Sequence, residues 1–458
     1  MDGDTPEPEI LDRGRVSSNW SPPGTLPVMK ACILTWGCQQ NEHRSEEIAG
    51  VLAQAGYALV DTPEEADVVL LNTCMVRQRS EDKVLGRVGE LQRLRRSRPL
   101  LIGIGGCIPQ GRGERILDLV PGADFAFGTA GLAQLPTLIA RASCGERFAC
   151  LPTPNGLERL PVLRRSPFQA YVTVAEGCSH ACAYCVVPRV RGPLRSRPMP
   201  EVLVELRDLA RSGYREVTLL GQNVDAYGRD LGDGTTFARL LGEAAKIPIP
   251  RIRFTTSHPA YMTDEAIAAL AQGGNLCPHV HLAVQSGSDR ILAAMGRGYT
   301  REEFLALVRR LRGAIPEVNV TTDVIVGFPG ETEEDFAQTL SLLEEVSFGT
   351  VFAAMYSPRP GTRAAEMPDD VPPQEKGQRL AAVLDASRRI ALRLHEARIG
   401  TTVEVLVEGF LPAKGRLVGR TRDFRTVLFP GGPAMIGRWA MVTIEEAAAG
   451  ALHGRVVG

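Results

Sequence analysis

The chain has 458 residues, a formal net charge of -1 and a hydrophobic fraction of 44%, so it can build two or three domains with their own cores. This near-neutral charge gives no overall signature of nucleic-acid binding, and the sequence holds no apolar run long enough to span a membrane. The acidic, proline-rich residues 1–27 do not resemble a signal peptide and are expected to form a disordered tail. We therefore predict a cytoplasmic protein, whose ten cysteines stay reduced and are available as metal ligands.

Apolar runs and helical stretches alternate along most of the chain. Residues 28–148, with the strand candidates ACILTW, DVVLLN, LLIGIG and ADFAFG, predict a parallel α/β sheet domain. After a linker, residues 164–396 show six further strand candidates separated by helices, which predicts a complete or partial α/β barrel. Residues 397–458 change to short strands broken by glycine and proline, which predicts a small antiparallel, OB-like β-barrel.

Three cysteines in the first segment each lie directly after an apolar strand. Cys38, Cys74 and Cys107 are 36 and 33 residues apart, about one strand–helix unit, so a parallel sheet would bring them to its carboxyl edge. Glycines directly before two of them allow sharp turns and close approach to a cofactor. This pattern predicts an iron–sulfur cluster with one open iron, with zinc or a redox-active thiol set as the alternative.

The strongest motif lies in the loop after the first strand of the predicted barrel. Cys178, Cys182 and Cys185 have the spacing C-x3-C-x2-C, which lets three thiolates converge on one 4Fe–4S cluster. With no fourth cysteine nearby, one iron is left open for the amino and carboxylate groups of S-adenosylmethionine (SAM). The alternatives are a zinc site or three structural cysteines.

Six segments spread over residues 29–458 together resemble the radical SAM methylthiotransferase family. They are TWGCQQNEHRSE, LLNTCMVRQRSEDKV, GGCIPQ, AEGCSHACAYCVVPRVRGPLRSRP, GQNVDAYG and YSPRPGT. The resemblance implies two 4Fe–4S clusters. The one at Cys178, Cys182 and Cys185 would bind SAM and generate a radical, and the auxiliary one would hold the sulfur-containing group. Two departures, Gln40 where Met is usual and Met75 where Ser is common, leave the cluster ligands unchanged.

The residues around the cysteines also bear on the substrate. NTCMVR and GQNVDAYG are most similar to family members that modify carbon 2 of an isopentenylated adenosine next to the anticodon of tRNA. Relatives that act on threonylcarbamoyladenosine in tRNA or on a ribosomal protein share the six cysteines, so these substrates remain alternatives, as does a non-enzymatic zinc module that binds RNA. The resemblance further implies a second SAM as methyl donor and an electron donor such as flavodoxin or ferredoxin. We expect a monomer.

Polar and basic residues outside the cysteine motifs are the remaining candidates for ligand contacts. Residues at the carboxyl ends of two barrel strands face the active mouth and are expected to bind SAM, or alternatively to cap the following helices. They are Gly221, Gln222, Asn223, Gln285 and Ser286. Four arginines after the first cluster loop are expected to contact RNA or the SAM carboxylate: Arg189, Arg191, Arg195 and Arg197.

The C-terminal segment is more basic than the chain as a whole. Between residues 398 and 458, eight Lys or Arg stand against five Asp or Glu, and the segment resembles a TRAM domain, an RNA-binding β-barrel. Arginines around one phenylalanine suit phosphate contact combined with base stacking, with a structural lid as the alternative. The expected RNA-binding residues are Arg416, Arg420, Arg422, Phe424 and Arg425.

Overall fold

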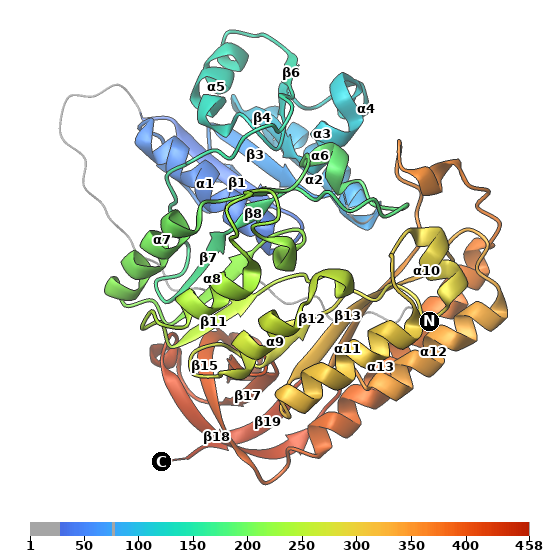
Figure 1. Cartoon of the computed structure of the whole chain (residues 1–458). Helices are drawn as coiled ribbons and strands as arrows, with labels where there is room; N and C mark the ends of the chain where they lie inside the picture. The colour runs from blue at the N-terminus through green and yellow to red at the C-terminus, as the bar shows by residue number, and fades with distance from the viewer. Residues whose placement is uncertain (1–27, 76–77, 458) are drawn as a thin grey trace.

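The structure, a computed structural model, describes residues 28–75 and 78–457, which form three consecutive units (Figure 1). The sheet-containing N-terminal unit lies at one end of the molecule, the larger α/β unit in the middle and the C-terminal β-barrel at the other end. The disordered tail expected for residues 1–27 lies outside the described residues. The predicted fold class, an α/β sheet followed by an α/β barrel and a small β-barrel, is confirmed.

The first unit is a six-stranded sheet in the order β2-β1-β3-β4-β5-β6, and all of its strand pairs are parallel. Its strands are β1 (Lys30–Thr35), β2 (Ala58–Leu59), β3 (Val68–Thr73), β4 (Leu101–Gly106), β5 (Phe125–Phe127) and β6 (Phe148–Cys150). Its helices are α1 (Gln39–Gln54), α2 (Gln78–Arg95), α3 (Cys107–Arg112), α4 (Ile116–Leu119) and α5 (Leu135–Ser143). Strand β3 is buried at every position, which explains its continuous apolar sequence.

The second unit places six parallel strands in two three-stranded sheets, β11-β10-β7 and β12-β13-β14. Isolated bridges between residues 252 and 276 and between 257 and 282 join the two sheets into a partial barrel. The strands are β7 (Gln169–Thr173), β10 (Glu216–Leu220), β11 (Arg251–Phe254), β12 (His279–His281), β13 (Asn319–Val326) and β14 (Thr350–Met355), and a two-stranded ribbon, β8 (Ala175–Glu176) and β9 (Arg195–Ser196), lies beside them.

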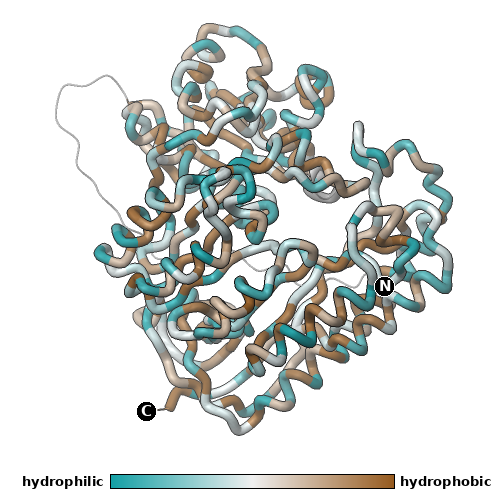
Figure 2. Tube along the Cα trace, in the orientation of Figure 1, coloured by the Kyte–Doolittle hydropathy of each residue, from teal (hydrophilic) through white to brown (hydrophobic). Residues whose placement is uncertain are grey.

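Amphipathic helices cover the outside of the partial barrel. In Figure 2 the long helices at the lower right, which are α11, α12 and α13 in Figure 1, alternate between hydrophobic and hydrophilic positions. Two of them begin with a capping box, at Thr300 and Thr332, which fixes their starting points. The helices of this unit are α6 (Val187–Val190), α7 (Met199–Arg211), α8 (Phe237–Ala244), α9 (Asp264–Ala271), α10 (Asp289–Met295), α11 (Arg301–Ala314), α12 (Glu333–Val346) and α13 (Pro373–Glu396).

The third unit is a closed five-stranded barrel in the order β15-β16-β17-β19-β18. Its strands are β15 (Thr402–Leu411), β16 (Arg416–Thr421), β17 (Thr426–Pro430), β18 (Trp439–Ala447) and β19 (Leu452–Val456). Alternate residues such as Val427 and Phe429 point inward and form its core. One pair, β17 with β19, is parallel, so the barrel is not entirely antiparallel as expected.

Two buried arginines on β11 hold the C-terminal barrel against the amino ends of the central strands. Arg253, 3% exposed, donates 2.7 Å hydrogen bonds to the carbonyl oxygens of Thr421 and Arg422. Arg251, which is completely buried, donates to the carbonyl of Arg420 and pairs with Glu404 at 2.9 Å. An α/β barrel carries out its chemistry at the carboxyl ends of its strands. These contacts therefore place the C-terminal barrel at the end opposite to the active end.

Removing one of these arginines is expected to destabilise the protein strongly. Arg253 also pairs at 2.9 Å with Glu216, which is 4% exposed, so Arg253→Ala removes the nearest cation from a buried carboxylate and leaves it only Gln169 at 3.1 Å and Arg251 at 3.9 Å. We expect a loss of about 3–5 kcal/mol in unfolding free energy, measured by urea unfolding of the apoprotein. The control Arg211→Ala removes an exposed arginine that pairs with exposed Asp208 and is expected to cost less than about 1 kcal/mol. Equal losses in both variants would contradict this role.

Candidate active site and cysteine triads

The predicted SAM cluster loop begins directly after β8, at the carboxyl end of β7. Gly177 has φ +75°, and a Cβ atom there would collide with the carbonyl oxygens of Gly192 and Pro193, so the turn requires glycine. The N–H of Cys178 donates to the Gly192 carbonyl at 3.1 Å. The loop therefore packs back to back with residues 192–193 and carries three half-buried cysteines: Cys178, Cys182 and Cys185.

An arginine from the far side of the barrel lies against this triad. Arg297, 3% exposed, places Nη1 at 3.2 Å from the Cys182 sulfur and also donates to the Ala283 carbonyl. Burial raises the pKa of Cys185 to about 12, so a free thiol there would stay protonated and unreactive. A bound metal deprotonates its thiol ligands outright, and Arg297 adds compensating positive charge. The donor set fits a metal cluster better than a reactive free thiol.

Two histidines flank the triad. The rings of His180 and His258 are 4.1 Å apart, and ligand atoms of both lie within 4.8 Å of the Cys182 sulfur and of each other. His180 is fixed by Tyr261 at 3.2 Å and by the Gly296 carbonyl at 3.0 Å. Burial lowers the pKa of His258 to about 2, with further contributions from neighbouring positive charge, so its ring is neutral.

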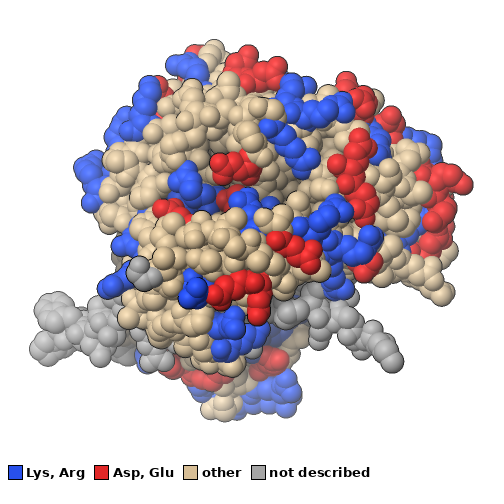
Figure 3. Space-filling model, turned by 90° about the horizontal axis from the view of Figure 1, so that it is seen from below, with Lys and Arg blue, Asp and Glu red and all other residues tan. Residues whose placement is uncertain are grey.

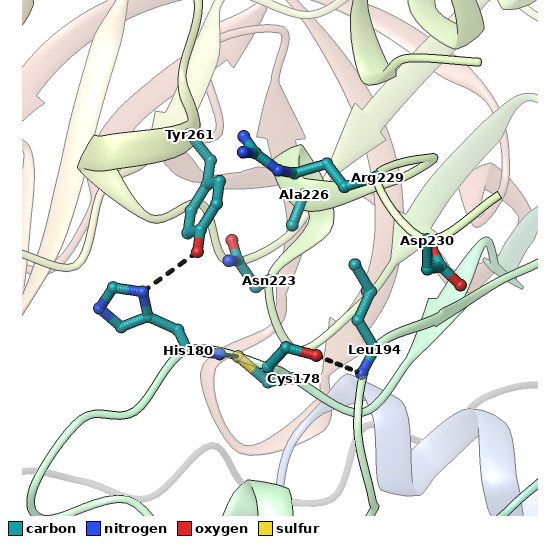
Figure 4. A pocket seen from close by; sticks show the side chains of 9 residues that line it. Cys178, His180, Leu194, Asn223, Ala226, Arg229, Asp230 and Tyr261 are labelled. Atoms are coloured by element: carbon teal, nitrogen blue, oxygen red, sulfur yellow. Dashed lines mark hydrogen bonds between the residues drawn. The ribbon is translucent and has the colours of Figure 1, made fainter. Parts of the chain in front are cut away.

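A hollow of about 150 Å³ opens beside Cys178. Figure 4 shows His180 and Tyr261 pointing toward each other, with Asn223 beside this pair and Arg229 on the side of Tyr261 away from His180. Behind Asn223, Asp225 is buried and accepts from the His258 backbone N–H, and burial raises the pKa of Asp225 to about 8. The hollow next to the Cys178 triad is therefore lined by both polar and apolar side chains, with Arg229 and Asp230 as its charged members.

Three of the five predicted SAM ligands have buried polar atoms without a hydrogen-bond partner among the described residues. These atoms are Nε2 of Gln222, Oδ1 of Asn223 and Oε1 of Gln285. Gln285 also has φ +76°, a strained conformation for a side chain other than glycine. Buried polar atoms are normally paired, so these three fit a polar ligand that completes the site. Ser286 instead contacts Thr339 at 3.3 Å, and Gly221 offers no side chain.

The auxiliary triad lies at the carboxyl edge of the first sheet, because Cys38, Cys74 and Cys107 follow the neighbouring strands β1, β3 and β4. Gly37 has φ +132°, and a Cβ atom there would lie 2.6 Å from the Cβ of Cys74. Gly106 has φ +91° and would meet the Thr73 carbonyl oxygen at 2.6 Å. Glycine thus permits the close approach that brings the three cysteines together, and the thiol set fits a second metal group.

Helix α1 connects the auxiliary triad to the active end of the central unit. It begins directly after Cys38 and is buried along most of its length. Gln40 donates to the Thr173 hydroxyl at 3.0 Å, and Arg44 pairs with Glu176, two residues before Cys178. The two triads therefore lie on facing units at one end of the β7 strand.

The arginines after the first cluster loop do not form one group. Arg189 is exposed, whereas Arg191 is 6% exposed and lies beside the auxiliary cysteines. Arg195 contacts Glu176 and the Pro154 carbonyl. Arg197 donates to the Thr173 carbonyl and to Glu205. Three of the four therefore make contacts within the chain rather than offering a free basic surface.

Most of the predicted RNA-binding residues lie at the junction between the C-terminal barrel and the central unit. Phe424 stacks on His279 with ring centroids 4.7 Å apart, and Arg422 donates to the carbonyls of Gly274 and Leu276. Arg425 pairs with Asp423 at 2.9 Å. These contacts use the groups that RNA would need, which counts against RNA contact by Arg422, Phe424 and Arg425.

Two residues of that set stay candidates. Arg416 contacts His453 at 3.0 Å, and Arg420 pairs with Glu408 at 3.3 Å while lying over the Phe424 ring. Both remain partly exposed. On the face of the molecule seen in Figure 3, the described basic and acidic side chains are interspersed, without a broad patch of one sign.

Sequence reasoning missed Arg297, His180, His258 and Tyr261 as residues of the site. Only His180 had a local signal, because it lies within the C-x3-C-x2-C loop. Tyr261 and Arg297 are 81 and 115 residues from their partners on that loop, so only the closure of the barrel brings them to the loop.

Three family models match the chain in the order of its three units. They are the Uncharacterized protein family UPF0004 over residues 30–128, the Radical SAM superfamily over residues 172–343 and the TRAM domain over residues 396–457. The radical SAM methyltransferase TsrM of Kitasatospora setae shares the fold, with a TM-score of 0.55, 15% identity and coverage of 74% of this chain and 75% of that chain. Together with the cysteine motif, the family match defines a radical SAM enzyme.

Similarity to curated proteins extends over nearly the whole chain. It is 45% identical to the tRNA-2-methylthio-N(6)-dimethylallyladenosine synthase of Thermotoga petrophila, over 94% of this chain and 97% of that protein. The proteins of the same name from Carboxydothermus hydrogenoformans and Bordetella parapertussis are 46% and 45% identical, over 90% and 94% of this chain and 96% and 92% of theirs. The chain belongs to this family, which confirms the resemblance seen in its motifs.

The expected cofactors, SAM and two 4Fe–4S clusters, agree with this membership. Among the described residues, no helix has the length and apolar character needed to cross a membrane.

Proposed function

We propose that this chain methylthiolates carbon 2 of N6-dimethylallyladenosine at position 37 of tRNA, giving 2-methylthio-N6-dimethylallyladenosine. The observation that carries the proposal is the pair of cysteine triads on facing units. The chain that holds them is similar, over 94% of its length, to a synthase that is named for this product. Carbon 2 of the adenine bears a hydrogen that is neither acidic nor easily displaced by a nucleophile. A cofactor that supplies radical chemistry is therefore required, and the protein's part is binding and orientation.

The residues of the site divide this work. Cys178, Cys182 and Cys185 would hold the cluster that, with SAM, supplies the hydrogen-abstracting radical. Arg297 would balance the charge of these thiolates and fix Cys182, to which it donates at 3.2 Å. Gln222, Asn223 and Gln285 would donate to or accept from SAM through the buried atoms that lack partners within the described chain.

Cys38, Cys74 and Cys107 would hold the auxiliary cluster. Their place at the carboxyl edge of the first sheet, facing the central unit, suits the presentation of a sulfur-containing group to a base bound between the two units. A small electron-transfer protein such as flavodoxin or ferredoxin would supply electrons. We further propose that the enzyme acts as a monomer in the cytoplasm, where its tRNA substrate is found.

Nucleoside mass spectrometry of bulk tRNA tests the substrate directly. A strain lacking the gene should lose 2-methylthio-N6-dimethylallyladenosine and accumulate the unmethylthiolated nucleoside, and the wild-type gene should restore the product. An unchanged level of this product, with loss of a methylthiolated threonylcarbamoyladenosine or of a ribosomal-protein modification, would contradict the proposed substrate and identify one of the alternatives.

The C-terminal barrel is proposed to contact tRNA through the basic residues that remain exposed. Arg416→Glu should weaken tRNA binding and reduce the slope of log affinity against log salt by about 1, as expected for one lost phosphate contact. Arg309→Glu is the control, because Arg309 lies on α11 of the central unit, is 61% exposed and undergoes the same charge change. It should leave the slope unchanged. Filter binding across a salt titration measures both. Identical slopes for Arg416→Glu and wild type would remove Arg416 from the interface.

A further inference from the structure

A buried arginine joins the two cysteine triads. Arg191 lies just after α6, six residues beyond Cys185, and its side chain is 6% exposed. The guanidinium leaves its own unit and reaches the auxiliary site, where Nη2 donates a 2.7 Å hydrogen bond to Oδ1 of Asn41. Asn41 is itself completely buried near the start of α1, three residues after Cys38.

The same guanidinium interacts with the auxiliary cysteines. Cys107 and Cys38 are the neighbours that attract it most strongly. An arginine guanidinium stays protonated at neutral pH, so Arg191 brings a positive charge to this edge of the sheet. Its buried Nη1 has no hydrogen-bond partner among the described residues, which leaves one donor for a group bound at the triad.

The backbone of this arginine is tied to the other triad. The carbonyl of the next residue, Gly192, accepts the N–H of Cys178 at 3.1 Å, and Gly177 must be glycine for the two segments to pack. The Arg191 carbonyl accepts from Arg195 at 3.0 Å, which fixes the turn. One short segment therefore supports the SAM cluster loop with its backbone and reaches the auxiliary cysteines with its side chain.

We propose that Arg191 is the positioning residue of the auxiliary triad, holding in place the start of α1, which directly follows Cys38, and supplying positive charge to the cluster bound there. This inference rests on the proposed assignment of Cys38, Cys74 and Cys107 as ligands of the second cluster. Net charge and hydrogen bonds to the ligand sulfurs set the reduction potential of an iron–sulfur cluster. Reduction adds negative charge, so a neighbouring cation stabilises the reduced form and raises the potential.

The test is a potentiometric titration of the full-length, anaerobically reconstituted protein followed by electron paramagnetic resonance. Cys178, Cys182 and Cys185 are all replaced by alanine in the parent, so that only the auxiliary cluster contributes a signal. Arg191→Gln in this parent should shift the midpoint potential to a more negative value. Arg191→Lys, which keeps the positive charge, should have a midpoint potential close to that of the parent. The control Arg189→Gln removes an exposed arginine from the same short segment and should leave the potential unchanged.

Each possible result of this titration supports or contradicts the proposed role of Arg191. A parent-like potential in Arg191→Gln, or an equal shift in Arg189→Gln, would overturn the proposal. If Arg191→Gln takes up no iron, Arg191→Lys tests the proposal in its place. A loaded cluster with a parent-like potential in Arg191→Lys would support the charge role of Arg191, and a lack of iron in this variant would overturn it. A parent that takes up no iron at all would instead refute the ligand assignment of the auxiliary cysteines, independently of Arg191.

Discussion

Replacing Cys178, Cys182 and Cys185 together with alanine is expected to lower the iron content of the reconstituted protein from about eight to about four per chain. The same variant should lose reductive cleavage of SAM entirely. The three thiols lie on one loop beside Arg297 and the pocket lined by Asn223, and none of the auxiliary cysteines is among the residues that line this pocket. Iron analysis and chromatographic detection of 5′-deoxyadenosine measure the two effects.

The control for this experiment is Cys144→Ala, because Cys144 is exposed and lies at the end of α5, away from both triads. This variant should keep about eight irons and wild-type SAM cleavage. Deoxyadenosine formation at the wild-type rate in the triple variant would be incompatible with the assignment of this loop as the SAM site. Loss of all iron, rather than half, would show that the two sites do not load independently.

Much of the fold follows from local sequence pattern. The parallel sheets were predictable because buried strands such as β3 are continuous apolar runs, and the helices between them are long enough to be periodic. Strands β2 and β6 escaped prediction because they have two and three residues and no alternation. The parallel pairing of β17 with β19 depends on barrel closure, which strand patterns alone do not specify.

The placement of the auxiliary cysteines at one sheet edge was predictable for a similar reason, since each of them directly follows an apolar strand. The partners that complete the site were not. Arg297 meets Cys182 across 115 positions, and Arg191 meets Asn41 across 150, so each pair depends on tertiary packing. The arginines around Phe424 show what a local pattern leaves out: Phe424 and Arg422, predicted to contact RNA, also contact the central unit, and this packing could not be predicted from the sequence.

Replacing Cys38, Cys74 and Cys107 together with alanine should separate radical generation from sulfur transfer. We expect about four irons per chain and continued reductive cleavage of SAM, because the first triad keeps its loop, Arg297 and its pocket. Methylthiolated tRNA should fall below detection in a mass-spectrometric assay with isopentenylated tRNA, since no site remains to present sulfur. Helix α1 is anchored to the central unit by Gln40 and Arg44 as well as by Arg191, so the two units should stay docked in this variant.

The single variant Cys32→Ala is the matched control for that experiment. Cys32 lies within β1, six residues before Cys38, and is buried with its sulfur 3.7 Å from the Asp61 carbonyl rather than at the sheet edge. It should retain both clusters and product formation, with at most a modest loss of stability. Product formation by the Cys38/Cys74/Cys107 variant at the control rate would mean that the auxiliary triad is structural and that sulfur reaches the base by another route. Loss of both SAM cleavage and product would instead mean that the auxiliary site is needed to maintain the Cys178 cluster. The Arg191 segment, which packs against the Cys178 loop, is the structural connection between the two sites.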